Sequence, residues 1–200
     1  MSYLDDSLAH LEIFEGTVPW MYLDTKGLVT VGVGEMLANA ARAQSLGFVD
    51  SAGQPATPDA ILAEFNRVSA LAPAKAAGFY RSRNSPLLPH AVIDTLLMNH
   101  LNFFDEQLAG RFPVYATFPD SAKLGLLDMI YNLGVTGLFH GFPHFMGFVD
   151  NQDWRNAAAN CHRVGPSQAR NDWTRQQFLA AAATAASGAD GTSANAGTNT

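Results

Sequence analysis

The sequence predicts an α+β fold that is mostly helical, with one small β-hairpin near the N-terminus. Residues 90–108 and 118–133 repeat apolar side chains at the 3.6-residue period of a helix. Residues 21–23 and 28–34 flank a turn that ends at Gly27, a sequence typical of a hairpin. Hydrophobic residues make up 48% of the 200 residues and charged residues 15%, so the chain carries enough apolar surface for a core.

Further helices follow from start and stop signals. Residues 7–15 form an amphipathic helix with Asp5 or Asp6 as its N-cap, and Gly16 ends it. Residues 36–46 form a second helix. Thr57 followed by Pro58 begins a third, which runs to about residue 71.

Two segments break this helical pattern. Residues 72–89 contain three prolines and Gly78, which predict an irregular insertion. Its side chains Arg81, Arg83 and Asn84 either line a groove or are simply solvated. Residues 187–200 lack large apolar side chains, so we expect a disordered tail.

Two carboxylates and a hydroxyl lie in a short window around the hairpin: Glu15, Asp24 and Thr30. Glu15 ends a helix, where the negative end of the dipole favours a carboxyl that keeps its proton. Asp24 lies at the turn and Thr30 on the returning strand. Glycoside hydrolysis needs one carboxyl to donate a proton and a second to direct the nucleophile, so this arrangement suggests that chemistry.

The spacing of these residues resembles that of the phage-type lysozymes, the endolysin muramidases similar to the T-even phage enzymes. Eight residues separate Glu15 from Asp24, five separate Asp24 from Thr30, and Val-Gly-Val-Gly follows at 31–34. Residues 128–134, 153–158 and 170–174 resemble later helices of the family more weakly. The resemblance implies a catalytic domain over residues 1–186 with two lobes, a hairpin lobe at about 16–56 and a helical lobe at about 90–186.

The resemblance also implies roles for the motif residues. Glu15 would protonate the glycosidic oxygen, Asp24 would act as base or electrostatic partner, and Thr30 would help hold the attacking water. The family is read as inverting, a geometry in which the two carboxyl groups stand roughly 6.5–9.5 Å apart.

Four further residues are assigned around this site. Gly32, Glu35 and Asn132 are assigned to substrate binding. Glu35 stands where the family commonly has histidine, and we expect its role to be structural. Asn132 either contacts a sugar acetamido group or caps a turn. Arg170 either pairs with Glu15, as the resemblance implies, or is a solvated helix residue.

The function implied is hydrolysis of the β-1,4 bond between N-acetylmuramic acid and N-acetylglucosamine in peptidoglycan, by a phage endolysin or an antibacterial effector. Alternatives are a catalytically inactive peptidoglycan-binding protein, a lytic transglycosylase or a chitinase. No cofactor or metal is expected: His140 and His144 have ligand-like spacing, but Gly141 and Pro143 between them disfavour a regular helix.

Charge and composition limit the partners and the compartment. The net charge is −6 and no basic run occurs, which disfavours nucleic acid. A single cysteine, Cys161, excludes an intrachain disulfide and is expected to be buried. The sequence shows no signal peptide and no apolar run that would cross a membrane. We therefore expect a monomer made in the cytoplasm and delivered by a holin or a secretion system to the periplasm or cell wall. Its expected partners are peptidoglycan glycan strands and a cognate immunity or inhibitor protein.

Overall fold

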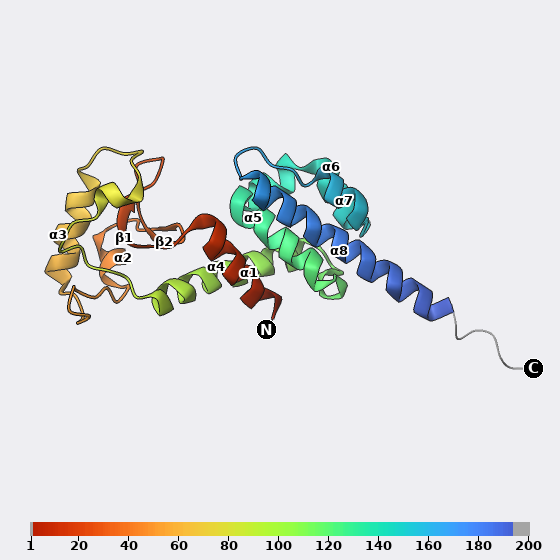
Figure 1. Cartoon of the computed structure of the whole chain (residues 1–200), viewed down its shortest axis with the longest axis horizontal. Helices are drawn as coiled ribbons and strands as arrows, with labels where there is room; N and C mark the ends of the chain where they lie inside the picture. The colour runs from red at the N-terminus through yellow and green to blue at the C-terminus, as the bar shows by residue number, and fades with distance from the viewer. Residues whose placement is uncertain (1, 194–200) are drawn as a thin grey trace, which may run out of the picture. The chain divides into compact units, whose positions relative to one another are not determined.

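The predicted α+β, mostly helical class is confirmed by a computed structural model, which describes the backbone of residues 2–193 and the side chains of residues 2–187. The fold is mostly helical, with one three-stranded antiparallel sheet (Figure 1). The chain forms two compact units. Of the described residues, one unit comprises residues 8–99, and the other comprises residues 2–7 and 100–193.

The unit of residues 8–99 holds the sheet. Its elements are the end of α1 (Tyr3–Glu15), β1 (Val18–Leu23), β2 (Val29–Gly32), β3 (Glu35–Met36), α2 (Ala40–Gln44), α3 (Pro58–Ser69), the 3₁₀ helix η1 (Ala77–Tyr80) and the start of α4 (His90–Arg111). Helix α2 packs against α3, and both α3 and η1 pack against β1. The core of this unit is formed by apolar side chains such as Met21, Val31, Phe48, Ile61 and Val68.

The predicted hairpin is present, and its register pairs Tyr22 with Thr30 and Leu23 with Val29. The turn is closed by the Gly27 N–H, which donates to the Asp24 carbonyl oxygen at 3.1 Å. Gly27 has a φ of +79°, a left-handed conformation that glycine adopts without strain.

The predicted helix at residues 36–46 is wrong at its start. Gly32 and Gly34 both have positive φ and turn the chain back on itself, so that Glu35 and Met36 form a third strand beside β2. Helix α2 begins only after Asn39, whose side chain accepts a hydrogen bond from the Arg42 N–H. The next helix starts as predicted, because the Thr57 hydroxyl accepts from the Ala60 N–H and Pro58 occupies the first turn.

The first helix begins earlier than predicted. Helix α1 starts at Tyr3, and Ser2 caps it in place of Asp5 or Asp6. The Asp5 N–H donates to the Ser2 hydroxyl at 3.3 Å, and the Ser2 N–H donates to the Asp5 carboxylate at 2.8 Å. This reciprocal pair is a capping box, in which the carboxylate belongs to the third helical residue rather than to the cap.

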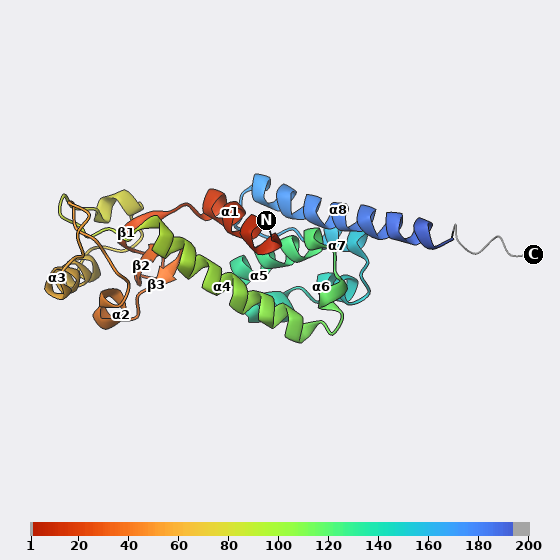
Figure 2. The ribbon, with the colours of Figure 1, turned by 90° about the horizontal axis from the view of Figure 1, so that it is seen from below.

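The second unit is helical. After the end of α4 come η2 (Tyr115–Thr117), α5 (Asp120–Gly141), α6 (Pro143–Asp150), α7 (Trp154–Asn160) and α8 (Gln168–Ser193). Helix α8 packs against both α5 and α7 (Figure 2). Phe118, Phe145, Trp154 and Phe178 form an aromatic cluster in its core. Gly125 is required there, because a Cβ atom would lie 2.7 Å from the ring of Phe178.

Two helix ends differ from the sequence prediction. The helix predicted over residues 118–133 is interrupted at Gly134, which has non-helical dihedral angles (φ 72°, ψ 167°), but it resumes beyond this residue and continues to Gly141. Helix α8 continues past residue 186, where we expected the tail to begin, and ends at Ser193. The alanine-rich run before it has high helix propensity and extends the helix. Residues 194–200 lie outside the described part of the chain. Among the described residues, no helix is both long and apolar enough to cross a bilayer.

Candidate functional site

Glu15 is the last residue of α1, and its side chain is exposed. The helix stops there because Gly16 takes a φ of +74°, while the Gly16 N–H still donates to the Glu12 carbonyl oxygen at 3.2 Å. The chain then turns directly into β1. The predicted position of Glu15 at a helix C-terminus beside the hairpin is confirmed.

Asp24 follows β1 and builds the hairpin turn with one of its two carboxylate oxygens. Its Oδ1 atom accepts hydrogen bonds from the N–H groups of Lys26 and Leu28, both at 2.8 Å. This is an Asx-type turn, in which a side-chain oxygen replaces a backbone acceptor. Within residues 2–193, no hydrogen bond engages Oδ2, so that oxygen is available to a ligand. The sequence predicted the turn but not that the two carboxylate oxygens of Asp24 have different roles.

Thr30 is buried on β2, with 3% of its surface exposed. Its hydroxyl donates to the Leu28 carbonyl oxygen at 3.0 Å. Tyr22 stands directly opposite Thr30 across the hairpin, so the two side chains share one face of the sheet.

Tyr22 lies near both predicted catalytic carboxylates. Burial raises the pKa of its phenol, and the negative charges of Asp24 and Glu15 raise it further. Coulombic effects of this kind require the charges to be close to the phenol. Sequence reasoning did not single out Tyr22, although this residue lies in the predicted hairpin strand at residues 21–23.

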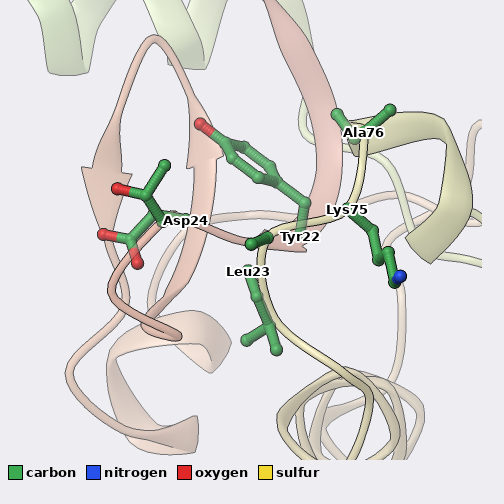
Figure 3. Close-up of a pocket in the computed structure, with 8 residues that line it drawn as sticks. Tyr22, Leu23, Asp24, Lys75 and Ala76 are labelled. Atoms are coloured by element: carbon green, nitrogen blue, oxygen red, sulfur yellow. The ribbon is translucent and has the colours of Figure 1, made fainter.

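A pocket of about 370 Å³ opens beside Asp24 (Figure 3). The end of β1 and the turn form one wall, and residues 74–77 of the predicted insertion form the other. Its lining residues are Tyr22, Leu23, Asp24, Thr25, Ala74, Lys75, Ala76 and Ala77. The volume falls at the small end of the range for ligand sites in proteins.

Gly32 and Glu35 both have structural partners. Gly32 is buried with a φ of +67°, and a Cβ atom there would lie 3.1 Å from Ile93 Cγ2, so glycine permits β2 to pack against the start of α4. The Glu35 carboxylate accepts two hydrogen bonds from the Arg42 guanidinium, at 2.7 and 3.2 Å. Substrate contacts of Gly32 and Glu35 stay predictions.

Arg170 and Asn132 belong to the other unit. Arg170 is only 5% exposed, so its interpretation as a solvated helix residue is wrong. Its Nε atom donates to Asp128 Oδ1 at 2.7 Å, while Asp128 Oδ2 accepts from Arg163 at 2.6 Å and from Thr174 at 2.5 Å. The pairing of Arg170 with Glu15 stays a prediction. Asn132 is exposed on α5, two residues before the break at Gly134, and its sugar contact also stays a prediction.

The histidine pair is split between two helices, since α5 ends at Gly141 and α6 begins at Pro143. His140 and His144 are both exposed. In the described part of the chain, no group of three or more His, Cys, Asp or Glu side chains is arranged to hold a metal ion. Cys161 is buried, as predicted, and burial raises the pKa of its thiol.

No family model matches the sequence, and no curated protein matches it. The function is therefore inferred from the residues around Tyr22 and Asp24.

Proposed function

We propose that this protein is a glycoside hydrolase with a two-lobed, lysozyme-like fold, which cleaves the β-1,4 bond between N-acetylmuramic acid and N-acetylglucosamine in peptidoglycan. The observation that supports it best concerns Tyr22. The charges of Glu15 and Asp24 both raise the pKa of this one half-buried phenol, so the helix end and the hairpin turn each place a carboxyl group within Coulombic range of the same side chain. A glycosidase needs such a pair, one group for the leaving oxygen and one for the nucleophile.

Glu15 serves as the general acid in this proposal. It is exposed at the end of α1, so it has access to a bound polymer. Protonation of the glycosidic oxygen in the transition state by a positioned side chain contributes about 10²- to 10⁴-fold in rate.

Asp24 and Thr30 position and activate the attacking water in this proposal. The two Asx-turn hydrogen bonds fix the Asp24 carboxylate through Oδ1, which leaves Oδ2 for a water molecule or a developing positive charge. The Thr30 hydroxyl uses its proton on the Leu28 carbonyl, so its oxygen remains an acceptor for the attacking water. Fixed groups of this kind stabilise a transition state without reorganising during the reaction.

The biological setting that we propose is that of a phage endolysin or an antibacterial effector. Glycan strands are its polymeric partner, and an immunity or inhibitor protein accompanies it in the effector case. The acidic chain, with 18 Asp and Glu residues against 12 Lys and Arg, is suited to hold a glycan through hydrogen bonds and stacking rather than through overall charge attraction.

The test is clearance of purified murein by the wild type and by Glu15→Gln. Loss of the proton donor is expected to slow turbidity loss by about 10²-fold or more, since the amide keeps the shape but cannot donate an acidic proton. Glu106→Gln, which alters another exposed glutamate, is the matched control and should clear murein at the wild-type rate. Equal clearance by Glu15→Gln and wild type would remove Glu15 from the mechanism.

Product analysis separates this function from its alternatives. New reducing ends on muramic acid indicate hydrolysis, whereas anhydro-sugar ends indicate a lytic transglycosylase. Binding to murein with no released product would indicate an inactive binding protein, and cleavage of chitin in preference to murein would indicate a chitinase.

A further inference from the structure

The pocket beside Asp24 has a wall that lies outside the Glu-Asp-Thr motif. Residues 74–77 form that wall, and they belong to the segment between α3 and α4 whose prolines predicted an irregular insertion. The pocket therefore extends beyond the residues of the Glu-Asp-Thr motif.

This wall is held in place by a buried tyrosine. Tyr80 has 0% of its surface exposed. Its hydroxyl donates to the Ala72 carbonyl oxygen at 2.9 Å and accepts from the Lys75 N–H at 3.3 Å. The hairpin turn also lies close to this wall. A Cβ atom placed on Gly27 would lie 3.6 Å from Pro73 Cβ, so the turn and the insertion are within van der Waals distance of each other.

A polar network fixes the rest of the insertion to α3. Arg67 donates to the Glu64 carboxylate at 2.7 and 2.8 Å and also to the Tyr80 carbonyl oxygen. The Ser85 hydroxyl donates to the same carboxylate at 2.5 Å. Glu64 is 6% exposed, so these bonds lie in a buried setting, where polar groups need partners. The pocket is thus a preformed feature of this unit.

The lining combines small apolar side chains with one charge of each sign. Three alanine methyl groups and Leu23 supply apolar surface, and Tyr22 supplies an aromatic ring. In Figure 3 the Asp24 carboxylate lies on one side of the Tyr22 ring, and the Lys75 side chain lies on the other side and extends away from the ring. A ligand with an apolar methyl group and a single carboxylate suits this lining, because its carboxylate is attracted to Lys75 and repelled from Asp24.

We propose that this pocket binds the N-acetylmuramic acid unit of the glycan, with a carboxylate of that unit at Lys75 and its acetamido methyl group among the alanines. The carboxylate is that of the lactyl ether or that of the attached peptide. N-acetylglucosamine has the same ring and acetamido group without the lactyl ether, so Lys75 distinguishes the two sugars of murein and also distinguishes murein from chitin. The identity of the sugar rests on the proposed function, whereas the selectivity for a carboxylate rests on the pocket.

The test is an NMR titration of the full chain that follows the methyl signals of Ala74, Ala76 and Ala77. The probes are N-acetylmuramic acid, N-acetylmuramoyl dipeptide and N-acetylglucosamine. We expect the acidic probes to shift these signals at lower concentration than N-acetylglucosamine does. Lys75→Gln should weaken binding of the acidic probes about 2- to 5-fold, the range for an exposed ion pair, and leave N-acetylglucosamine unchanged. Preference for the free acid over the dipeptide would assign the contact to the lactyl carboxylate, and the reverse would assign it to the peptide.

Lys26→Gln is the matched control. Lys26 is exposed in the hairpin turn and does not line the pocket, so its loss removes the same charge nearby. Equal weakening by both variants would overturn the role of Lys75, since it would indicate general charge attraction. Unshifted alanine methyl groups with the acidic sugars would overturn the site itself.

Murein clearance is measured in parallel and reports on the proposed function separately. Selective binding of the acidic probes without any murein cleavage would leave the pocket assignment standing and reject the hydrolase. Murein cleavage without shifts at the three alanines would reject the pocket assignment and leave the hydrolase standing.

Discussion

Asp24 uses its two carboxylate oxygens differently. Oδ1 accepts two backbone N–H groups and holds the turn, while Oδ2 faces no hydrogen-bond donor within the described residues. The turn therefore fixes the carboxylate that the proposed mechanism uses. The effects of this residue on stability and on activity can be separated by mutation, because asparagine keeps a side-chain oxygen for the turn whereas alanine does not.

Asp24→Asn and Asp24→Ala are expected to differ in stability and to agree in activity. The asparagine variant retains an amide oxygen as acceptor, so its free energy of unfolding should change by less than about 0.5 kcal/mol. Alanine at the same position loses two hydrogen bonds, which together are worth roughly 1–3 kcal/mol. Both variants should lose murein clearance. Chemical denaturation and turbidity assays check this, and an active Asp24→Asn would show that the negative charge is not needed.

At the scale of elements, local sequence signals were sufficient to predict the structure wherever a single residue sets the backbone conformation. Gly27 predicted the hairpin turn, and Thr57 with Pro58 predicted the start of α3. Each acts through its own conformation or through a partner a few residues away. The third strand was missed because Glu35 and Met36 have no strong preference of their own and pair only because two glycines turn the chain back.

The polar networks were not predictable from local signals. Glu64 and Ser85 are 21 residues apart, and Asp128 meets Arg163 and Arg170 across 35 and 42 residues. Hydrophobic periodicity does not report which charged residues are buried together. The motif of Glu15, Asp24 and Thr30 could be recognised in the sequence because its three residues lie within a single helix and hairpin, whereas the pocket wall at residues 74–77 depends on the Tyr80 contacts.

Tyr80→Phe is expected to loosen that wall. Phenylalanine fills the same buried space but loses both hydrogen bonds of the hydroxyl, to Ala72 and from Lys75. The unit should lose about 1–2 kcal/mol of stability, and the Lys75 amide proton should exchange faster with solvent. Tyr22→Phe is the control, because no hydrogen bond of the Tyr22 hydroxyl is described in residues 2–193. An unchanged exchange rate at Lys75 in Tyr80→Phe would mean that other contacts hold the wall.

At the scale of the whole molecule, buried ionisable groups in both units make stability depend on pH. In the unit of residues 8–99, burial alone would raise the pKa of Glu64, but hydrogen bonds from Arg67 and Ser85 and the Arg67 charge lower it overall. In the other unit, the Asp105 carboxylate accepts hydrogen bonds from the hydroxyl groups of Tyr3 and Tyr115, with O···O distances of 2.9 and 2.5 Å. Burial raises the pKa of both tyrosines, and the bond to Asp105 and its charge raise it further.

The fold should therefore lose stability at both ends of the pH scale. A lowered carboxyl pKa stabilises the fold above about pH 4, and this contribution is lost as the pH falls through the folded-state value. A raised phenol pKa stabilises the fold below about pH 10, and this contribution is lost as the pH rises, because the unfolded chain releases its phenol protons first. Amide exchange measured across pH should report acid opening in residues 8–99 and alkaline opening in the unit that contains Asp105. Asp105→Asn should reduce the alkaline dependence of that unit, because it removes the charge that adds to the effect of burial on the two phenol pKa values. The acid dependence of residues 8–99 should not change. An unchanged alkaline dependence in Asp105→Asn would contradict this assignment.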